Sequence, residues 1–132
     1  MDKLIEECSV KLKKNSVLHR NGECIIWTGC INKQGYGQFR FRFPRETPGT
    51  SHRTKTCHRI AIMVYYRDFD ISASQQASHL CNNKLCINTD HLALESSSLN
   101  NLRKNCFSNN RCYGHLDTDG NQLPNCLVEL SS

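Results

Sequence analysis

Two cysteines and a histidine near the middle of the chain have the spacing of metal ligands. Cys81, Cys86 and His91 lie within one short polar segment, a spacing typical of ligands that a single loop brings to zinc. His79 precedes this segment, and because only one residue separates it from Cys81, we expect it not to be a ligand. The alternatives for His79 are a structural histidine or a zinc ligand. Structural zinc sites usually have four ligands, so one more must come from elsewhere in the chain.

Length and composition favour a single small domain whose apolar core needs additional support. The chain has 132 residues, of which 38% are hydrophobic, and a core of this kind is thin. The nine cysteines cannot all pair within one chain because their number is odd. The sequence shows no apolar run of signal-peptide type and none of membrane-spanning length. We therefore expect an intracellular protein, cytoplasmic or nuclear and not secreted, whose cysteines and histidines bind zinc.

Positive charge is concentrated in one part of the chain. Lysine and arginine number 17 against 12 aspartates and glutamates, which gives a net charge of +5. This moderate excess fits a nucleic-acid partner, but many proteins with other partners carry as much. Between residues 38 and 59 the only acid is Glu46, and the basic residues are Arg40, Arg42, Arg45, Arg53, Lys55 and Arg59. This local excess is the stronger indication.

Hydrophobic periodicity predicts three helices and several short strands. The segments expected to be helical are 2–14, 58–67 and 98–105. The segments expected to be strands are 23–28, 36–43, 52–57, 75–79 and 92–95. On the first helix Leu4, Ile5, Cys8 and Leu12 share one face, and one of the three serines at 96–98 can cap the last helix. The second helix presents a broad apolar surface formed by Ile60, Ala61, Met63, Val64 and Tyr65.

The segment 36–43 alternates strictly between aromatic and polar residues. Phe39, Phe41 and Phe43 fall on one face, and Gln38, Arg40 and Arg42 fall on the other. We expect this strand to pair with 23–28 in antiparallel fashion, across a turn that Gly29, Asn32 and Gly35 mark. Its outer face is either a solvated polar surface or a basic ribbon for a DNA groove, which is wide enough to admit two strands.

Taken together, these features resemble the ββα-metal (HNH-like) nucleases, and most closely their His-Cys box branch, known from homing endonucleases. The resemblance covers about residues 77–115 and is carried by Ala77 to Cys81, Cys86, Asn88, His91, Leu92, Asn100 and Cys106. It implies an α+β fold, a small zinc-stapled ββα-metal (His-Me finger) domain with an antiparallel β-ribbon and few helices. We expect one domain over 1–132, with an N-terminal helix (1–20), basic strands (23–56), a catalytic core (75–105) and a second zinc-binding segment (106–126).

The resemblance also implies Mg²⁺-dependent hydrolysis of phosphodiester bonds in double-stranded DNA. His79 is the expected general base, since an imidazole can be neutral and still basic near pH 7. Asn100 is the expected Mg²⁺ ligand, because a hard cation prefers oxygen and can take its other ligands from the DNA phosphates and water. Asn101 is the alternative, but the nine-residue offset from His91 favours Asn100. The expected DNA contacts are Arg40, Arg42, Arg53, Lys55 and Arg59, and which of these arginines assists the scissile phosphate stays open.

Two structural Zn²⁺ sites are implied in the same way. Cys24 is the expected fourth ligand of the first site, with Cys30 and Cys57 as alternatives. Whichever cysteine is not a ligand should be buried, as Cys8 should be. The second site would use Cys106, Cys112, His115 and Cys126. It departs from the family's pattern, because two residues separate Cys112 from His115 and a longer gap precedes Cys126.

Two other interpretations remain open at the level of the sequence. A non-catalytic zinc-dependent DNA-binding module could use the same fold, although a pure binder has no chemical need for His79 or Asn100. A zinc-finger domain for protein interaction would explain the cysteines but not the arginine-bearing strand. A homodimer and a monomer that nicks one strand are both compatible with the sequence, and no membrane partner is expected.

Overall fold

The computed structural model describes residues 2–41, 53–72 and 74–130 of the chain. The helices of this part are α1 (Asp2–Lys14), α2 (Cys57–Tyr66) and α3 (Ser97–Ser108). Its strands form antiparallel pairs: β1 (Ser16–Leu18) with β2 (Ile25–Trp27), β3 (Gln38–Phe41) with β4 (Arg53–Thr56), β5 (Gln75–His79) with β6 (Leu92–Ser96), and β7 (His115–Leu116) with β8 (Gln122–Leu123). Single 3-10 turns lie at η1 (Thr89–His91) and η2 (Val128–Leu130). The α+β class is as expected.

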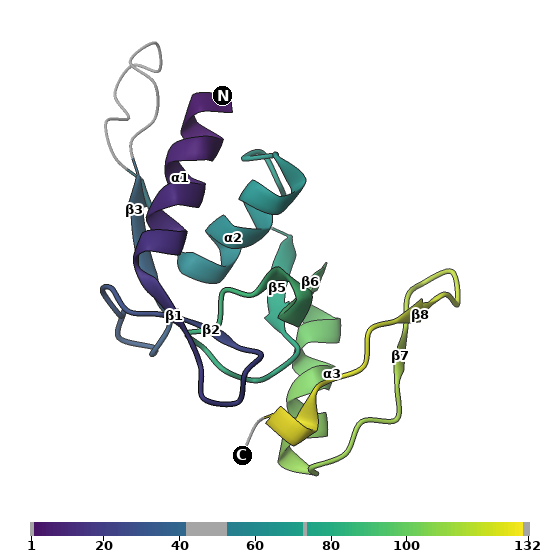
Figure 1. Ribbon diagram of the computed structural model, residues 1–132. Coiled ribbons are helices and arrows are strands. Elements are labelled where there is room, and N and C mark those ends of the chain that lie inside the picture. The colour runs from purple at the N-terminus through teal and green to yellow at the C-terminus, as the bar shows by residue number, and fades with distance from the viewer. Residues whose placement is uncertain (1, 42–52, 73, 131–132) are drawn as a thin grey trace.

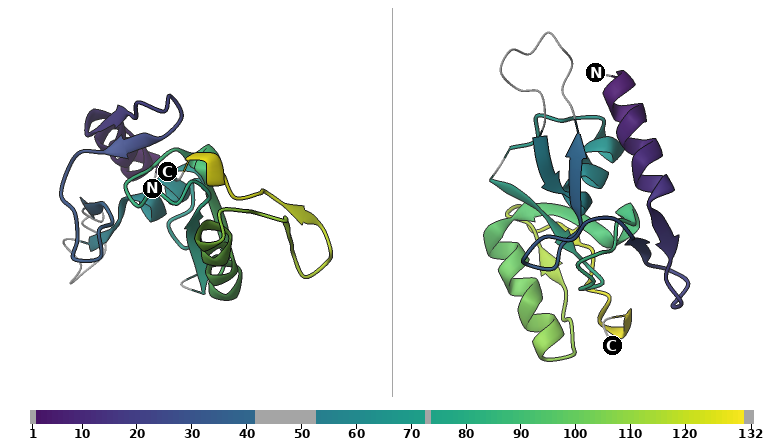
Figure 2. Two further views of the ribbon diagram at one scale, coloured as in Figure 1. Left: turned by 90° about the horizontal axis from the view of Figure 1, so that it is seen from below. Right: turned by 90° about the vertical axis from the view of Figure 1, so that its left-hand side faces the viewer.

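The elements fall into two groups on either side of the β5–β6 hairpin. Helices α1 and α2 lie side by side on one side of this hairpin, and α3 lies on the other (Figure 1). The β7–β8 hairpin projects away from the body of the molecule (Figure 2, left). Across the described residues, no helix combines the length and the apolar composition needed to traverse a bilayer.

The apolar core lies where α1 and α2 pack together and against β3. Helix α1 buries Leu4, Ile5, Cys8 and Leu12, which confirms the predicted face. Helix α2 buries its predicted apolar residues except at its C-terminal end, where Tyr65 is 63% exposed. Tyr65 stacks edge to face on Tyr66 and not on the core, so the predicted apolar surface is too wide at this position.

The alternation along β3 is confirmed for the part that the structure describes. Phe39 and Phe41 are buried and Gln38 and Arg40 are exposed, whereas Arg42 and Phe43 lie outside the described residues. Directly opposed residues of an antiparallel pair share a face. The register places Arg40 opposite Thr54 and Phe39 opposite Lys55. Arg40 therefore lies on the outer face, while Lys55 shares the face of the aromatic side chains.

The predicted pairing of 23–28 with 36–43 is wrong. Strand β2 pairs with β1, and β3 pairs with β4. The reason is the indole of Trp27, which donates to the carbonyl of Cys30 at 2.9 Å. A Cβ on Gly37 would lie only 2.8 Å from the indole, so the chain closes over Trp27 at a glycine. The connection between β2 and β3 therefore folds over the indole ring. Within the described residues of this connection, one isolated β-bridge joins Ile31 to Gly37.

The last helix begins directly after the β5–β6 hairpin. Ser96 caps it, since its hydroxyl accepts a hydrogen bond from the Leu99 backbone at 3.3 Å, and this confirms the predicted serine cap. Because α3 follows β6 without a loop, the direction of the helix is set by the end of the hairpin. Residues on its first turns are thereby placed beside the strand that carries His79.

Candidate active site and metal centres

Cys24, Cys81, Cys86 and His91 form one buried cluster. Their ligand atoms all lie within 4.8 Å of one another, and His91 Nδ1 is 3.6 Å from the sulfur atoms of both Cys24 and Cys86. Tetrahedral zinc, with bonds of about 2.3 Å to sulfur and 2.0 Å to nitrogen, separates such atoms by about 3.5 Å. The donor set and its spacing therefore fit Zn²⁺.

The backbone brings the loop after β5 against β2 and so gathers the cluster. Trp27 N donates to the carbonyl of Leu85 at 2.9 Å, and Ile87 N donates to the carbonyl of Ile25 at 2.8 Å. These bonds set Cys86, which lies between the two loop residues, beside the strand that Cys24 precedes. Residues far apart in the sequence thus become neighbours through main-chain bonds that depend little on side-chain identity.

The thiols of this cluster influence one another strongly. A hydrogen bond from Cys81 lowers the pKa of Cys86 to about 5, and the same bond raises the pKa of Cys81. Burial raises the pKa of Cys24, and the nearby charge of Cys86 acts in the same direction. Three buried thiolates would repel one another, so a divalent cation is the group that allows all of them to ionise together.

The structure leaves both alternative cysteines outside this cluster. Cys57 lies in the apolar core at the start of α2, where burial raises its pKa to about 12. Cys30 is exposed, contrary to the expectation that the remaining cysteine would be buried. The reason is again Trp27, whose ring fills the space beneath this turn and leaves the Cys30 side chain in solvent.

A second cluster consists of Cys106, Cys112, His115 and Cys126, again with all ligand atoms within 4.8 Å of one another. The sulfur atoms of Cys106 and Cys126 lie 3.4 and 3.6 Å from His115 Nε2, which also fits tetrahedral zinc. The long gap before Cys126 contains the β7–β8 hairpin, which turns the chain back toward α3. The longer gap before Cys126 is thereby explained. Burial raises the pKa of Cys126 to about 12, and a hydrogen bond from Arg103 opposes this shift.

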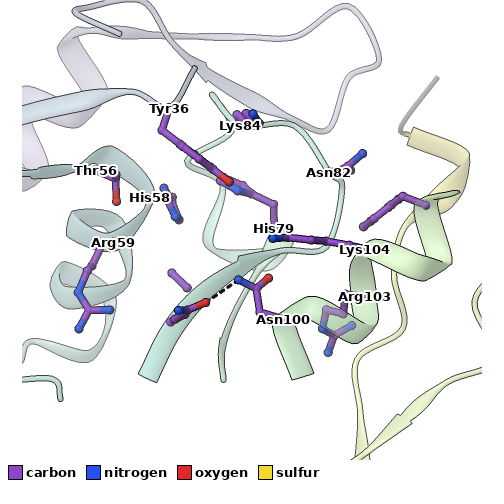
Figure 3. A pocket seen from close by; sticks show the side chains of 13 residues that line it. Tyr36, Thr56, His58, Arg59, His79, Asn82, Lys84, Asn100, Arg103 and Lys104 are labelled. Carbon is purple, nitrogen blue, oxygen red and sulfur yellow. Dashed lines mark hydrogen bonds between the residues drawn. The ribbon is translucent and has the colours of Figure 1, made fainter. Parts of the chain in front are cut away.

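A cavity of about 520 Å³ lies between α2, the β5–β6 hairpin and α3 (Figure 3). Most side chains in its wall are polar or cationic. They are Tyr36, Thr56, His58, Arg59, Gln76, His79, Asn82, Lys84, Asn100, Arg103 and Lys104, with Ala77 and Phe107 as the apolar members. The structure thus brings His79 and Asn100 to one cavity whose lining suits an anionic ligand.

One ring nitrogen of His79 is already bound. Nε2 lies 3.0 Å from the carbonyl oxygen of Cys86, and since a carbonyl only accepts, this nitrogen carries the hydrogen. The neutral ring then keeps Nδ1 as its acceptor. Burial lowers the pKa of His79 to about 4, although the bond to Cys86 acts in the opposite direction, so the ring is neutral at pH 7. Because Cys86 also belongs to the first cluster, that cluster fixes the orientation of the ring.

His79 packs against two further aromatic rings. Its ring centroid lies 4.3 Å from that of His58 and 6.0 Å from that of Tyr36. Burial lowers the pKa of His58 to about 3, and its Nδ1 has no hydrogen-bond partner among the described residues. Both contacts are missing from the sequence-based prediction, in which His58 appears only at the start of a helix. The rings supply a rigid wall beside the predicted base.

The amide of Asn100 is oriented by a residue that sequence reasoning missed. Asn100 Nδ2 donates to Gln76 Oε1 at 2.8 Å, the bond drawn as a dashed line in Figure 3. The amide oxygen is therefore turned to the other side, toward the cavity. An amide oxygen is a ligand that Mg²⁺ accepts, so the group fits this metal. The competing Asn101 is exposed and is not part of the wall.

Of the predicted DNA contacts whose side chains the structure describes, only Arg59 lines the cavity, and its guanidinium is already engaged. It donates to the carbonyl oxygens of Gln75, Ile71 and Ser72, at 2.6, 3.1 and 3.0 Å. These bonds hold the segment that leads into β5 and use three of the five N–H groups of the guanidinium. Arg40 and Lys55 lie on the β3–β4 pair, away from the cavity wall. Arg42 and the side chain of Arg53 lie outside the described part of the chain.

Two lysines that the prediction did not name also line the cavity. Lys104, on α3, is exposed beside the cavity. Lys84 donates to the carbonyl of Gln34 at 2.9 Å and lies 5.2 Å from the ring centroid of Tyr36. Their positions depend on the loop and the helix that frame the cavity, so the local basic excess at 38–59 could not reveal them.

Replacing Cys24 by serine should lower the zinc content by one equivalent per chain, since it removes one donor from the first cluster. Cys30→Ser is the matched control and should keep the full content, because Cys30 is exposed and outside both clusters. Zinc measured by atomic absorption after dialysis, beside thermal unfolding, tests both. Equal zinc content in the two variants would contradict the assignment.

Comparison with known proteins agrees with this geometry. The family model described as the zinc-binding loop region of homing endonuclease matches residues 23–132. Neither the curated proteins nor the solved structures gave a match. The matched range contains both clusters and every residue that lines the cavity. The chain therefore belongs to the family of zinc-binding loop regions of homing endonucleases, within the His-Me finger superfamily.

Proposed function

We propose that the protein is an endonuclease that hydrolyses phosphodiester bonds of double-stranded DNA with Mg²⁺. The observation that carries the proposal is the pairing, at one cavity, of two acceptor atoms that have no partner among the described residues. His79 keeps Nδ1 free because Nε2 is bound to Cys86, and Asn100 keeps its oxygen free because the amide nitrogen is bound to Gln76. The family supports a nuclease or another DNA-related function, and the two clusters support zinc.

His79 would act as the general base. A water held at Nδ1 would lose a proton to the ring as its oxygen attacks phosphorus. The bond from phosphorus to the 3′ oxygen would break, and the departing oxygen would take up a proton from solvent water. The ring must not turn during this step, and the bond to Cys86 together with the stack on His58 restrains it. The products are a 5′-phosphate and a 3′-hydroxyl.

Asn100 would hold the metal ion through its amide oxygen, with phosphate oxygens of the DNA as further ligands. The bound ion would neutralise the charge that develops on the phosphate and on the departing oxygen. Gln76 keeps the amide from rotating its nitrogen into this position, since the nitrogen already has an acceptor. Lys84 and Lys104 would attract the DNA backbone on either side of the cavity.

The outer face of the β3–β4 pair would extend the DNA-binding surface. This face carries Gln38, Arg40, Thr54 and Thr56, and Thr56 also lines the cavity. A duplex contacting Arg40 would thus continue into the cavity without crossing apolar surface. Because each chain would cut one strand at a time, cleavage of both strands points to a homodimer as part of the proposal.

His79→Ala should lower the cleavage rate by about 10²- to 10⁴-fold, because it removes the proton acceptor. Zinc content and DNA affinity should stay unchanged, since His79 is in neither cluster. Nicking of supercoiled plasmid with Mg²⁺ or EDTA measures the effect, and the ratio of linear to nicked product bears on the dimer. Wild-type protein that carries zinc and binds DNA but cuts neither plasmid nor a library of sites would instead be a non-catalytic binding module.

Asn100→Ala should weaken Mg²⁺-dependent cleavage and raise the Mg²⁺ concentration that gives half-maximal rate, because it removes the metal's protein ligand. The neighbouring Asn101→Ala is the matched control and should behave like the wild type, since Asn101 is exposed and does not line the cavity. Mg²⁺ titrations of both variants at a fixed plasmid concentration are the measurement. Overlapping curves for the two variants would rule out the role of Asn100.

Arg40→Ala should reduce the slope of log affinity against log salt concentration by about one, because one phosphate contact is lost. Arg67→Ala serves as the control, since Arg67 is exposed at the C-terminal end of α2 and pairs with Asp2 at 3.2 Å. Fluorescence anisotropy of labelled duplex DNA between low and physiological salt gives both slopes. Equal slopes for Arg40→Ala and the control would show that DNA does not contact the outer face of the β3–β4 pair.

A further inference from the structure

Helix α3 carries Asn100 and also Cys106 of the second cluster, yet none of its apolar side chains is fully buried. Arg103 is its one buried residue among those described, with 1% of its surface exposed. The adjacent Leu102 is 54% exposed. A helix usually packs on its domain through an apolar stripe. Here the fully buried position of the packed face is a charged side chain, and Leu99 and Phe107 beside it are only half-buried.

The guanidinium of Arg103 joins three parts of the chain. Its Nε donates to both carboxylate oxygens of Glu95, at 2.9 and 2.8 Å, and Nη2 also donates to this carboxylate, which lies on β6. Nη1 donates to the carbonyl of Pro124 at 2.8 Å and to the sulfur of Cys126 at 3.4 Å. One planar fork therefore links α3 to the β5–β6 hairpin and to a ligand residue of the second cluster.

These contacts make Arg103 and the cluster depend on each other. Glu95 is 5% exposed, so the ion pair is buried and each charge relies on the other for compensation. A thiolate of Cys126 on a metal ion would accept a charge-assisted hydrogen bond from Nη1. Outer contacts of this kind hold a ligand in place and raise the affinity of the site for its metal.

Asn100 lies one helical turn before Arg103, and both side chains line the same cavity (Figure 3). Among the described residues, the hydrogen bonds that side chains of α3 make to side chains of the hairpin come from these two residues, to Gln76 and to Glu95. Asn100 lies at the exposed end of the contact between α3 and the β5–β6 hairpin, and Arg103 lies at its buried end. A shift of the helix at Arg103 would therefore displace the amide of Asn100.

We infer that Arg103 is a positioning residue that makes the placement of Asn100 depend on the second metal cluster. Removing Arg103 or emptying the cluster would loosen α3 while His79 stays fixed by the first cluster. The part of this inference that concerns cleavage rests on the proposed function. The part that concerns zinc retention does not.

The zinc test uses a double variant so that no buried charge is left without a partner. Glu95→Gln with Arg103→Met removes both charges together, Arg103→Lys keeps the charge without the fork, and Lys104→Met is the control on the next, exposed residue. In a titration with a coloured chelator, both Arg103 variants should release one of their two zinc equivalents at a roughly 10- to 100-fold lower chelator concentration than the wild type does. The control should release both equivalents at the wild-type concentrations. Release identical to that of wild type in a folded double variant would overturn the inference.

The coupling test compares Mg²⁺ requirements for plasmid nicking. Cys126→Ser should raise the half-maximal Mg²⁺ concentration roughly 5- to 100-fold, and so should the Arg103 variants. Combining Cys126→Ser with the double variant should raise the Mg²⁺ requirement little further, because both changes break the same link between α3 and the second cluster. An unchanged requirement, or effects that multiply, would overturn the coupling. If wild-type protein does not cleave DNA, the proposed function fails, and zinc release alone decides whether Arg103 supports the cluster.

Discussion

The junction between β2 and the loop after β5 is the constraint on which the cavity depends. Main-chain hydrogen bonds bring the two segments together, and the first cluster unites Cys24 with residues far along the chain. The carbonyl of Cys86 then holds the ring of His79. With only 38% hydrophobic residues, the chain has a small apolar core, and metal coordination can supply part of the folding free energy that such a core lacks.

The two clusters serve different halves of the cavity. The first lies behind the strand and loop that carry His79, and the second lies at the far end of the helix that carries Asn100. Neither functional side chain is held by apolar packing alone. His79 combines a main-chain bond with ring stacking, and Asn100 depends on one amide contact and on the anchoring of α3. Directional polar contacts define the positions of atoms more narrowly than apolar contacts do, which suits the alignment of a base with a metal ion that we propose.

The features that the sequence predicted well are those set by neighbours along the chain. The buried face of α1, the alternation around Phe39 and the serine cap of α3 follow from periodicity and local hydrogen bonding. The choice among Cys24, Cys30 and Cys57 required the fold, because it depends on how β2 meets a distant loop. The partner of β3 could not be read from the sequence either, since the bulk of Trp27 redirects the connection that a turn signal suggested. Gln76 and Arg103 are ordinary polar residues in the sequence, and their importance arises only from what lies opposite them.

The exposed thiol of Cys30 has a consequence for how the protein behaves outside a reducing environment. Eight of its cysteines are buried or belong to a cluster, so a metal-loaded chain presents this one thiol to oxidants and alkylating reagents. Oxidation would join two chains at this position first, and the resulting covalent pair would say nothing about the natural assembly state. The same accessibility makes Cys30 a selective attachment point for a fluorophore. Cys30 lies next to Trp27 and to the first residue of β3. The binding of a polyanion to the β3–β4 pair would therefore change the environment of such a label and its fluorescence.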